Sequence, residues 1–136
     1  MQTEESRQLV LSYYEALATS DPAALEQILS DDVVWAPPAS APIEGPFEGR
    51  ETVLKAMGES GAQFFDMASL RMTTHKMVAD GDTVVVLQHL SGKAVNGRDY
   101  ANEYVWVFTC ADGRIVRMEE HNDSLHFHRI VMSESP

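Results

Sequence analysis

Residues 100–123 read YANEYVWVFTCADGRIVRMEEHND and predict a long β-hairpin. Asp112-Gly113 separates two apolar-rich runs, and glycine readily adopts the positive φ that a tight turn requires. Because alternate side chains of a strand point to opposite faces of a sheet, the even-numbered residues should share one face. That face is mostly aromatic and apolar, with polar groups near one end, as is typical of a small-molecule site. Its members are Asn102, Tyr104, Trp106, Phe108, Cys110, Val116, Met118, Glu120 and Asn122.

The chain before this hairpin predicts three helices and three strands. Apolar residues at three- and four-residue spacings indicate helices, and Asp21-Pro22 is a typical helix start because Asp caps free N–H groups and Pro suits the first turn. Residues 124–132 predict either a short terminal helix or an extra strand. The expected order is a helix at 4–19, a helix starting at 21–22, a strand at 33–35, a helix at 50–60, and strands at 64–79 and 83–95.

Residues 36–49 cannot form regular structure, because four prolines remove four backbone donors. A loop of this length in a small chain often carries function. The alternative is an ordered surface loop with Ile43 and Phe47 tucked against the body.

Composition limits the classes of partner. The 136 residues carry a formal net charge of −11, which argues against nucleic acid and anionic membranes because both require basic patches. The single cysteine, Cys110, excludes an internal disulfide. No apolar run approaches the roughly 20 residues of a membrane span, and the acidic, polar start does not resemble a signal peptide. We expect one domain, 1–136, in a soluble cytoplasmic protein.

Three stretches carry a resemblance to a known family: DPAALEQILSDDVVW at 21–35, EGRETV at 48–53, and the hairpin residues themselves. They resemble the nuclear-transport-factor-2-like superfamily, in its SnoaL-like and ketosteroid-isomerase-like branch, over about residues 5–128. The resemblance implies an α+β fold in which a curved mixed, mostly antiparallel sheet wraps around a conical pocket closed by three N-terminal helices. It also implies a homodimer through the sheet face and no cofactor.

The resemblance carries over to catalytic positions only in part. Tyr13 falls where ketosteroid isomerases have their oxyanion-hole tyrosine, but their general base would fall at about Ala36, which cannot act as one. Their second acid would fall near Tyr104 or Trp106. The Arg-x-Asp of similar epoxide hydrolases is also missing at 89–91, although their carboxylate matches Glu120. SnoaL-type cyclases place one acid near the end of the last strand, where Asp123 or Glu120 stands.

Four residues are candidates for catalysis. Glu120 should face the apolar side of the hairpin, where desolvation raises a carboxyl pKa and makes it a usable acid or base; the alternative is a rim carboxylate paired with Arg98. Asp123 could instead cap the segment that follows it. His89 has acid–base chemistry, but its strand is apolar on both faces and leaves its direction open. Tyr13 or His89 would be the hydrogen-bond partner of the carboxylate.

The remaining candidates would line a pocket or hold a metal. His121, His126 and His128 have no spacing typical of zinc, so the sequence predicts no metal site. The aromatic and apolar candidates serve equally as core or as pocket wall. We expect the pocket to be lined by Trp35, Asn102, Tyr104, Trp106, Phe108 and Met118.

Two functions fit these features. One is a cofactor-independent isomerase, cyclase or hydrolase that acts on a small hydrophobic molecule through carboxylate acid–base chemistry. The other is a protein that binds such a molecule without turnover. A second titratable group within hydrogen-bond reach of Glu120 would favour the enzyme. We also expect a homodimer, because a second apolar face cannot point into the pocket: Val85, Leu87, Val105 and Val107.

Overall fold

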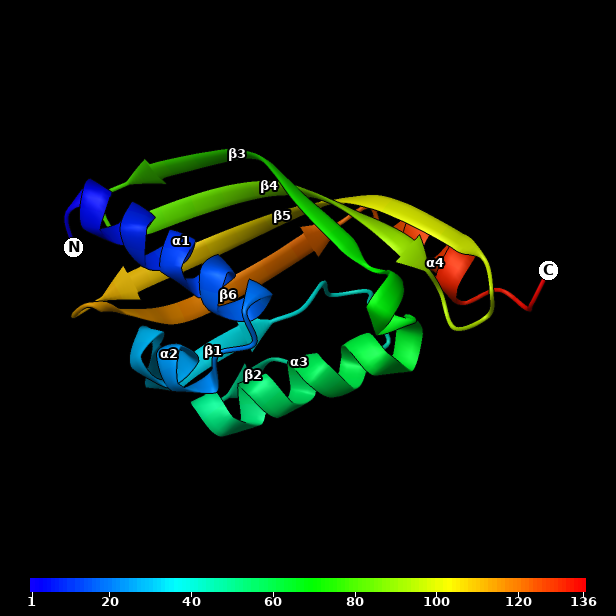
Figure 1. Cartoon of the computed structure of the whole chain (residues 1–136), viewed down its shortest axis with the longest axis horizontal. Helices are drawn as coiled ribbons and strands as arrows, with labels where there is room; N and C mark the ends of the chain where they lie inside the picture. The colour runs from blue at the N-terminus through cyan, green and yellow to red at the C-terminus, as the bar shows by residue number, and fades with distance from the viewer.

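The computed structural model describes all 136 residues as a six-stranded sheet with helices against its inner face. In Figure 1 the sheet arches over α3, with α1 toward one end and α4 toward the other. The elements are α1 Thr3–Ala18, α2 Pro22–Ile28, β1 Leu29–Ala36, β2 Phe47–Glu48, α3 Arg50–Phe64, the short 3₁₀ helix η1 Met67–Ser69, β3 Arg71–Asp80, β4 Thr83–Lys93, β5 Asp99–Ala111, β6 Arg114–Asn122 and α4 Ser124–Val131.

The strand order is β2-β1-β6-β5-β4-β3, and every pairing is antiparallel except that of β1 with β6. The predicted α+β class with a curved, mixed, mostly antiparallel sheet is confirmed. Three helices precede the long strands, as expected. The terminal segment, left open between helix and strand, is the fourth helix, α4.

The hairpin of β5 and β6 is the centre of the sheet. Asp112 and Gly113 form its turn with φ of 52° and 76°, and Trp106 lies opposite Glu120. A bulge interrupts the register between Thr109 and Cys110. Beyond it Ile115 is fully buried and Val116 only partly, so the prediction that Val116 points inward is wrong. A bulge inserts one extra residue and thereby shifts the alternation.

The core has two parts, one toward each end of the sheet. The larger contains Val10 and Tyr13 of α1 packed on Phe108 and Met118 of the hairpin. The smaller gathers aromatic residues around α4: Phe64, Phe65, Tyr100, Tyr104 and Phe127. Residues of both parts reappear in the wall of the cavity described below.

Two elements are longer than the sequence suggests. The helix predicted at 50–60 continues to Phe64, since Gly58 and Gly61 do not interrupt it. The strand predicted at 33–35 begins at Leu29 and runs to Ala36 beside β6. Two predictions are wrong: Phe47–Glu48 of the proline-rich loop pairs with β1 as a short strand, and the strand predicted at 64–79 begins only at Arg71, after the end of α3 and the turn of η1. None of the helices combines the length and apolar character needed to cross a membrane.

Candidate functional site

A cavity of about 560 Å³ lies between the inner face of the sheet and α3. That volume falls within the roughly 300–1,000 Å³ of small-molecule sites. Sixteen of its 26 lining residues are hydrophobic, so any molecule that fills it must be largely apolar. α3 contributes Leu54 and Met57, and the four strands β3 to β6 form the opposite wall.

Glu120 is the only carboxylate in the wall of this cavity. Its position on β6, opposite Trp106, places it on the inner face. Burial raises the pKa of Glu120 from 4.5 to about 7, although a hydrogen bond from Trp35 favours the charged form. In that bond Trp35 Nε1 donates to Glu120 Oε1 at 3.1 Å. A carboxyl group with this pKa can either donate or accept a proton near neutral pH.

The strands that carry the wall contribute three further polar side chains, Gln88, Tyr104 and Asn122, while Ser60, Ser124 and His128 enter it from the helices. Asn122, two residues along β6, has a buried Oδ1 with no hydrogen-bond partner. Gln88 donates through Nε2 to Thr74 Oγ1 at 3.4 Å. Tyr104 shares a 2.7 Å hydrogen bond between its hydroxyl and that of Tyr100. A buried polar group without a partner is costly, and Asn122 Oδ1 is such a group among the side chains around Glu120.

The predicted lining residues divide into two groups. Trp35, Tyr104 and Trp106 line the cavity. Phe108 and Met118 do not, because both are fully buried in the larger core. Asn102 is also absent from the wall, because its Nδ2 donates to Tyr100 Oη at 2.8 Å and to the backbone oxygen of Asp123 at 3.0 Å.

Tyr13 lies in the core beneath the cavity rather than in its wall. Its ring meets that of Phe108 edge to face at 5.5 Å. Burial raises the pKa of Tyr13 above its usual range, and the charge of Glu120 adds to the rise. The two side chains share no hydrogen bond, so the expected Tyr13–Glu120 partnership is limited to an electrostatic one. Tyr14 has a buried hydroxyl without a partner.

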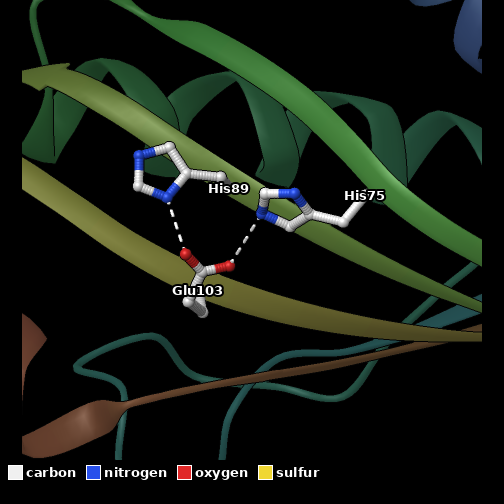
Figure 2. Close-up of side chains that lie close together, drawn as sticks. All are labelled: His75, His89 and Glu103. Atoms are coloured by element: carbon white, nitrogen blue, oxygen red, sulfur yellow. Dashed lines mark hydrogen bonds and ion pairs between the residues drawn. The ribbon is translucent and has the colours of Figure 1, made fainter.

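Asp123 and His89 do not meet Glu120 inside the cavity. Asp123 Oδ1 accepts a hydrogen bond from the backbone N–H of His126 at 3.1 Å and caps α4. His89 lies on the outer face, where its Nδ1 is 2.7 Å from Glu103 Oε1 (Figure 2). This hydrogen bond holds the pKa of Glu103 below its ordinary value. The residues on either side of His89, Gln88 and Leu90, are the ones that line the cavity.

The proline-rich loop supplies part of the wall. Pro38, Ala41 and Ile43 line the cavity, and Ser40 ties the loop to α4 because its backbone oxygen lies 2.8 Å from His128 Nε2. The length of the loop suggested a functional role from the sequence. Nothing in the sequence indicated that the loop would be bound to α4. The closing of the pocket by the N-terminal helices was expected, but the individual wall residues of α3 and the part played by α4 were missed, because an apolar helix stripe fits core equally well.

The amino-acid sequence was compared with models of known protein families and with curated proteins. A sequence model of the SnoaL-like domain matches residues 10–118. No curated protein matches the chain significantly.

Solved structures share the fold over nearly the full chain. An NTF2-like protein of unknown function from Burkholderia pseudomallei K96243 is 26% identical, with a TM-score of 0.81 over 95% of this chain and 98% of that one. A protein assigned as a SnoaL-like polyketide cyclase from Jannaschia sp. CCS1 is 18% identical, with a TM-score of 0.81 and coverages of 96% and 94%. TerC, crystallised with polyporic acid, is 20% identical, with a TM-score of 0.80 and coverages of 95% and 99%.

Proposed function

The chain belongs to the SnoaL-like domain family, and from that premise we propose that its cavity binds a small, largely apolar molecule on which Glu120 acts as general acid and base. The observation that carries the proposal is the position of the Glu120 carboxyl. It stands in an apolar cavity of about 560 Å³ with a pKa raised to about 7.

The chemistry follows from the surroundings of Glu120. When ionised it can take a proton from a carbon or hydroxyl of the bound molecule, and when protonated it can return that proton at another atom. Trp35 Nε1 holds one carboxyl oxygen at 3.1 Å, which leaves the other free to face the ligand. Asn122, two residues along β6, adds a second polar side chain to the same part of the wall. Such a one-proton transfer suits isomerisation, ring closure or addition of water.

A second function, binding without turnover, has an observation in its favour. The single hydrogen bond of the Glu120 carboxyl comes from Trp35, which does not titrate. No second titratable side chain lies within hydrogen-bond reach of it. Catalysis would therefore depend on Glu120 as its one titratable group. Binding without turnover requires no titratable group, so the isolation of Glu120 is compatible with it.

Tryptophan fluorescence tests whether the cavity binds ligand. The chain has two tryptophans, Trp35 and Trp106, and both line the cavity. Titration with N-phenyl-1-naphthylamine, an uncharged apolar fluorescent probe, should quench both and saturate at one probe per chain. Polyporic acid is the first natural compound to test, because TerC was crystallised with it. Absence of saturable quenching by the apolar probe would contradict the proposal.

A variant that fills the cavity tests whether the probe binds inside it or on the protein surface. Ser60→Phe should weaken probe binding strongly, because Ser60 lines the cavity and its hydroxyl bonds only within α3, to Met57 O at 3.2 Å. Glu59→Phe is the matched control, since Glu59 is exposed and absent from the wall. If both variants bind as tightly as wild type, the probe lies elsewhere.

Glu120→Gln separates the two functions. Gln retains an oxygen that accepts the Trp35 hydrogen bond, so binding should persist in either case. A substrate whose conversion, followed by mass spectrometry, stops in Glu120→Gln while binding is retained establishes the enzyme. Conversion at the wild-type rate in Glu120→Gln would show that this carboxylate is not the acid or base.

A further inference from the structure

Two histidines and one glutamate converge on one face of the sheet (Figure 2), and none of the three lines the cavity on the other face. His75, His89 and Glu103 come from the adjacent strands β3, β4 and β5. His75 Nε2 lies 3.2 Å from Glu103 Oε2, and His89 Nδ1 lies 2.7 Å from Glu103 Oε1. One ligand atom of each residue falls within 4.8 Å of the other two.

The register of the sheet brings these three side chains together. His89 and Glu103 are direct cross-strand partners of β4 and β5. His75 is the extra residue of a bulge in β3, since Thr74 pairs with Gln88 and Lys76 already pairs with Leu87. A bulge bends its strand and re-aims the side chain it carries. Here it directs the His75 ring toward Glu103, across the intervening strand β4.

The three groups are a ligand set for a divalent transition metal. Neutral imidazole nitrogens and a carboxylate bind Zn²⁺ and its neighbours, and three protein ligands with one free position are a common arrangement. Ligands of a tetrahedral Zn²⁺ with bonds of about 2.0–2.1 Å lie about 3.3 Å apart. The two histidine nitrogens contact different oxygens of Glu103, at 3.2 and 2.7 Å, so an ion would replace these two hydrogen bonds as the carboxylate turns to offer it one oxygen.

A purely structural role explains the cluster less well. The side chains of His75, His89 and Glu103 are 49%, 36% and 65% exposed, and exposed ion pairs add little to stability. Glu103 pairs with no lysine or arginine, so no fixed cation competes for its oxygens. The net charge of −11 also favours the approach of cations.

We propose that His75, His89 and Glu103 form a surface site for a divalent transition-metal cation of the Zn²⁺ type, with water or another donor in the fourth position. The sequence predicted no metal site, and the three histidines considered and set aside there, His121, His126 and His128, take no part in this cluster. It is also independent of the cavity, which lies on the opposite face of the same strands.

Isothermal titration of tag-free, metal-stripped protein with ZnCl₂ tests the proposal. We expect one Zn²⁺ per chain and a rise in the thermal unfolding midpoint that a chelator reverses, because an ion that binds only the folded state stabilises it. His75→Ala, His89→Ala and Glu103→Gln should each weaken binding by about tenfold or more, at least the loss that outer-shell changes cause at metal sites.

His126→Ala is the matched control. His126 lies on α4, stacks on Tyr100 at 6.0 Å and contributes no atom to the cluster, so its removal should leave Zn²⁺ binding unchanged. Circular dichroism of the metal-free variants checks that each still folds. The proposal is overturned by the absence of saturable binding at one ion per chain, by binding that survives both His75→Ala and His89→Ala, or by binding lost in His126→Ala.

Discussion

At the scale of single residues, the site depends on one carboxyl group and on the face that it occupies. Strand alternation predicted that Glu120 points inward with Met118, and the structure places both on the inner face. Met118 is buried in the core while Glu120 reaches the cavity one step further along β6. The alternation of side chains predicts which face of the sheet a residue occupies. It does not predict whether that residue is buried in the core or lines the cavity, because this depends on which helix packs against each part of the strand.

Glu120→Gln should change how stability depends on pH. The pKa of Glu120 rises from 4.5 to about 7 on folding, so its ionisation opposes the folded state. That cost is absent below about pH 4.5, where both states are protonated, and it grows until about pH 7. Glu120→Gln lacks this cost. The difference in free energy of unfolding between the variant and wild type should therefore shift by roughly 3 kcal/mol in favour of the variant from pH 4 to pH 8.

Urea denaturation at several pH values measures this difference. Glu119→Gln is the control, since Glu119 is the next residue, pairs with Arg117 at 3.8 Å and is absent from the cavity wall; it should follow the wild-type curve. A gap between Glu120→Gln and wild type that stays constant from pH 4 to 8 would show that Glu120 ionises as freely in the folded state as in the unfolded one.

Bulges are the residue-scale features that sequence reasoning missed. One in β6 brings Ile115 rather than Val116 into the core, and one in β3 turns His75 toward Glu103. Each inserts one residue into an otherwise regular ladder, and neither position carries a glycine or proline that would signal it. The metal-ligand cluster could therefore not be found from spacing alone, since its members come from three strands.

At the scale of elements, the helices and the hairpin were predictable because their signals are local. Asp21 caps α2 by accepting from the Ala24 N–H at 3.1 Å, and Asp112-Gly113 forms the turn. The roles of α4 and of the loop before β2 were not predictable. Both close the cavity through contacts between residues that are far apart in sequence, such as His128 with Ser40.

Asp123→Ala should destabilise the protein by about 1 kcal/mol, the usual loss on removing a helix N-cap. Asp123 Oδ1 accepts from the His126 N–H at 3.1 Å, and Asn can make the same bond, so Asp123→Asn should cost much less. Thermal or chemical denaturation gives both values. Probe binding in the cavity should be unchanged in Asp123→Asn, and a loss of binding there would mean that the carboxylate has a role beyond the cap.

At the scale of the whole molecule, the sequence motifs were sufficient to predict the family and the curved sheet. The homodimer stays a prediction. The outer face of β4 and β5 carries a strip of partly exposed apolar side chains: Val85, Leu87, Val105 and Val107. We propose that a second copy covers this strip, since an apolar patch of this kind on a sheet marks an interaction surface.

Sedimentation equilibrium at micromolar concentration should therefore give a species of twice the 15.1 kDa chain. Leu87→Lys should shift it to the monomer, because a charge on the strip would have to be buried without a partner. Leu11→Lys, at an exposed site on α1 and thus on the other side of the sheet, is the control and should stay dimeric. A single species near 15.1 kDa for the wild type would rule out the dimer.

The proposed function requires a carboxyl group in the cavity that can exchange a proton at neutral pH. Carbon-detected NMR titration of the Glu120 side chain, assigned by comparison with Glu120→Gln, measures this directly. We expect a midpoint of about 7, raised by burial from the ordinary 4.5, and a further change when an apolar probe fills the cavity. A midpoint at or below 4.5, unaffected by the probe, would contradict the proposed function and remove Glu120 as the acid or base.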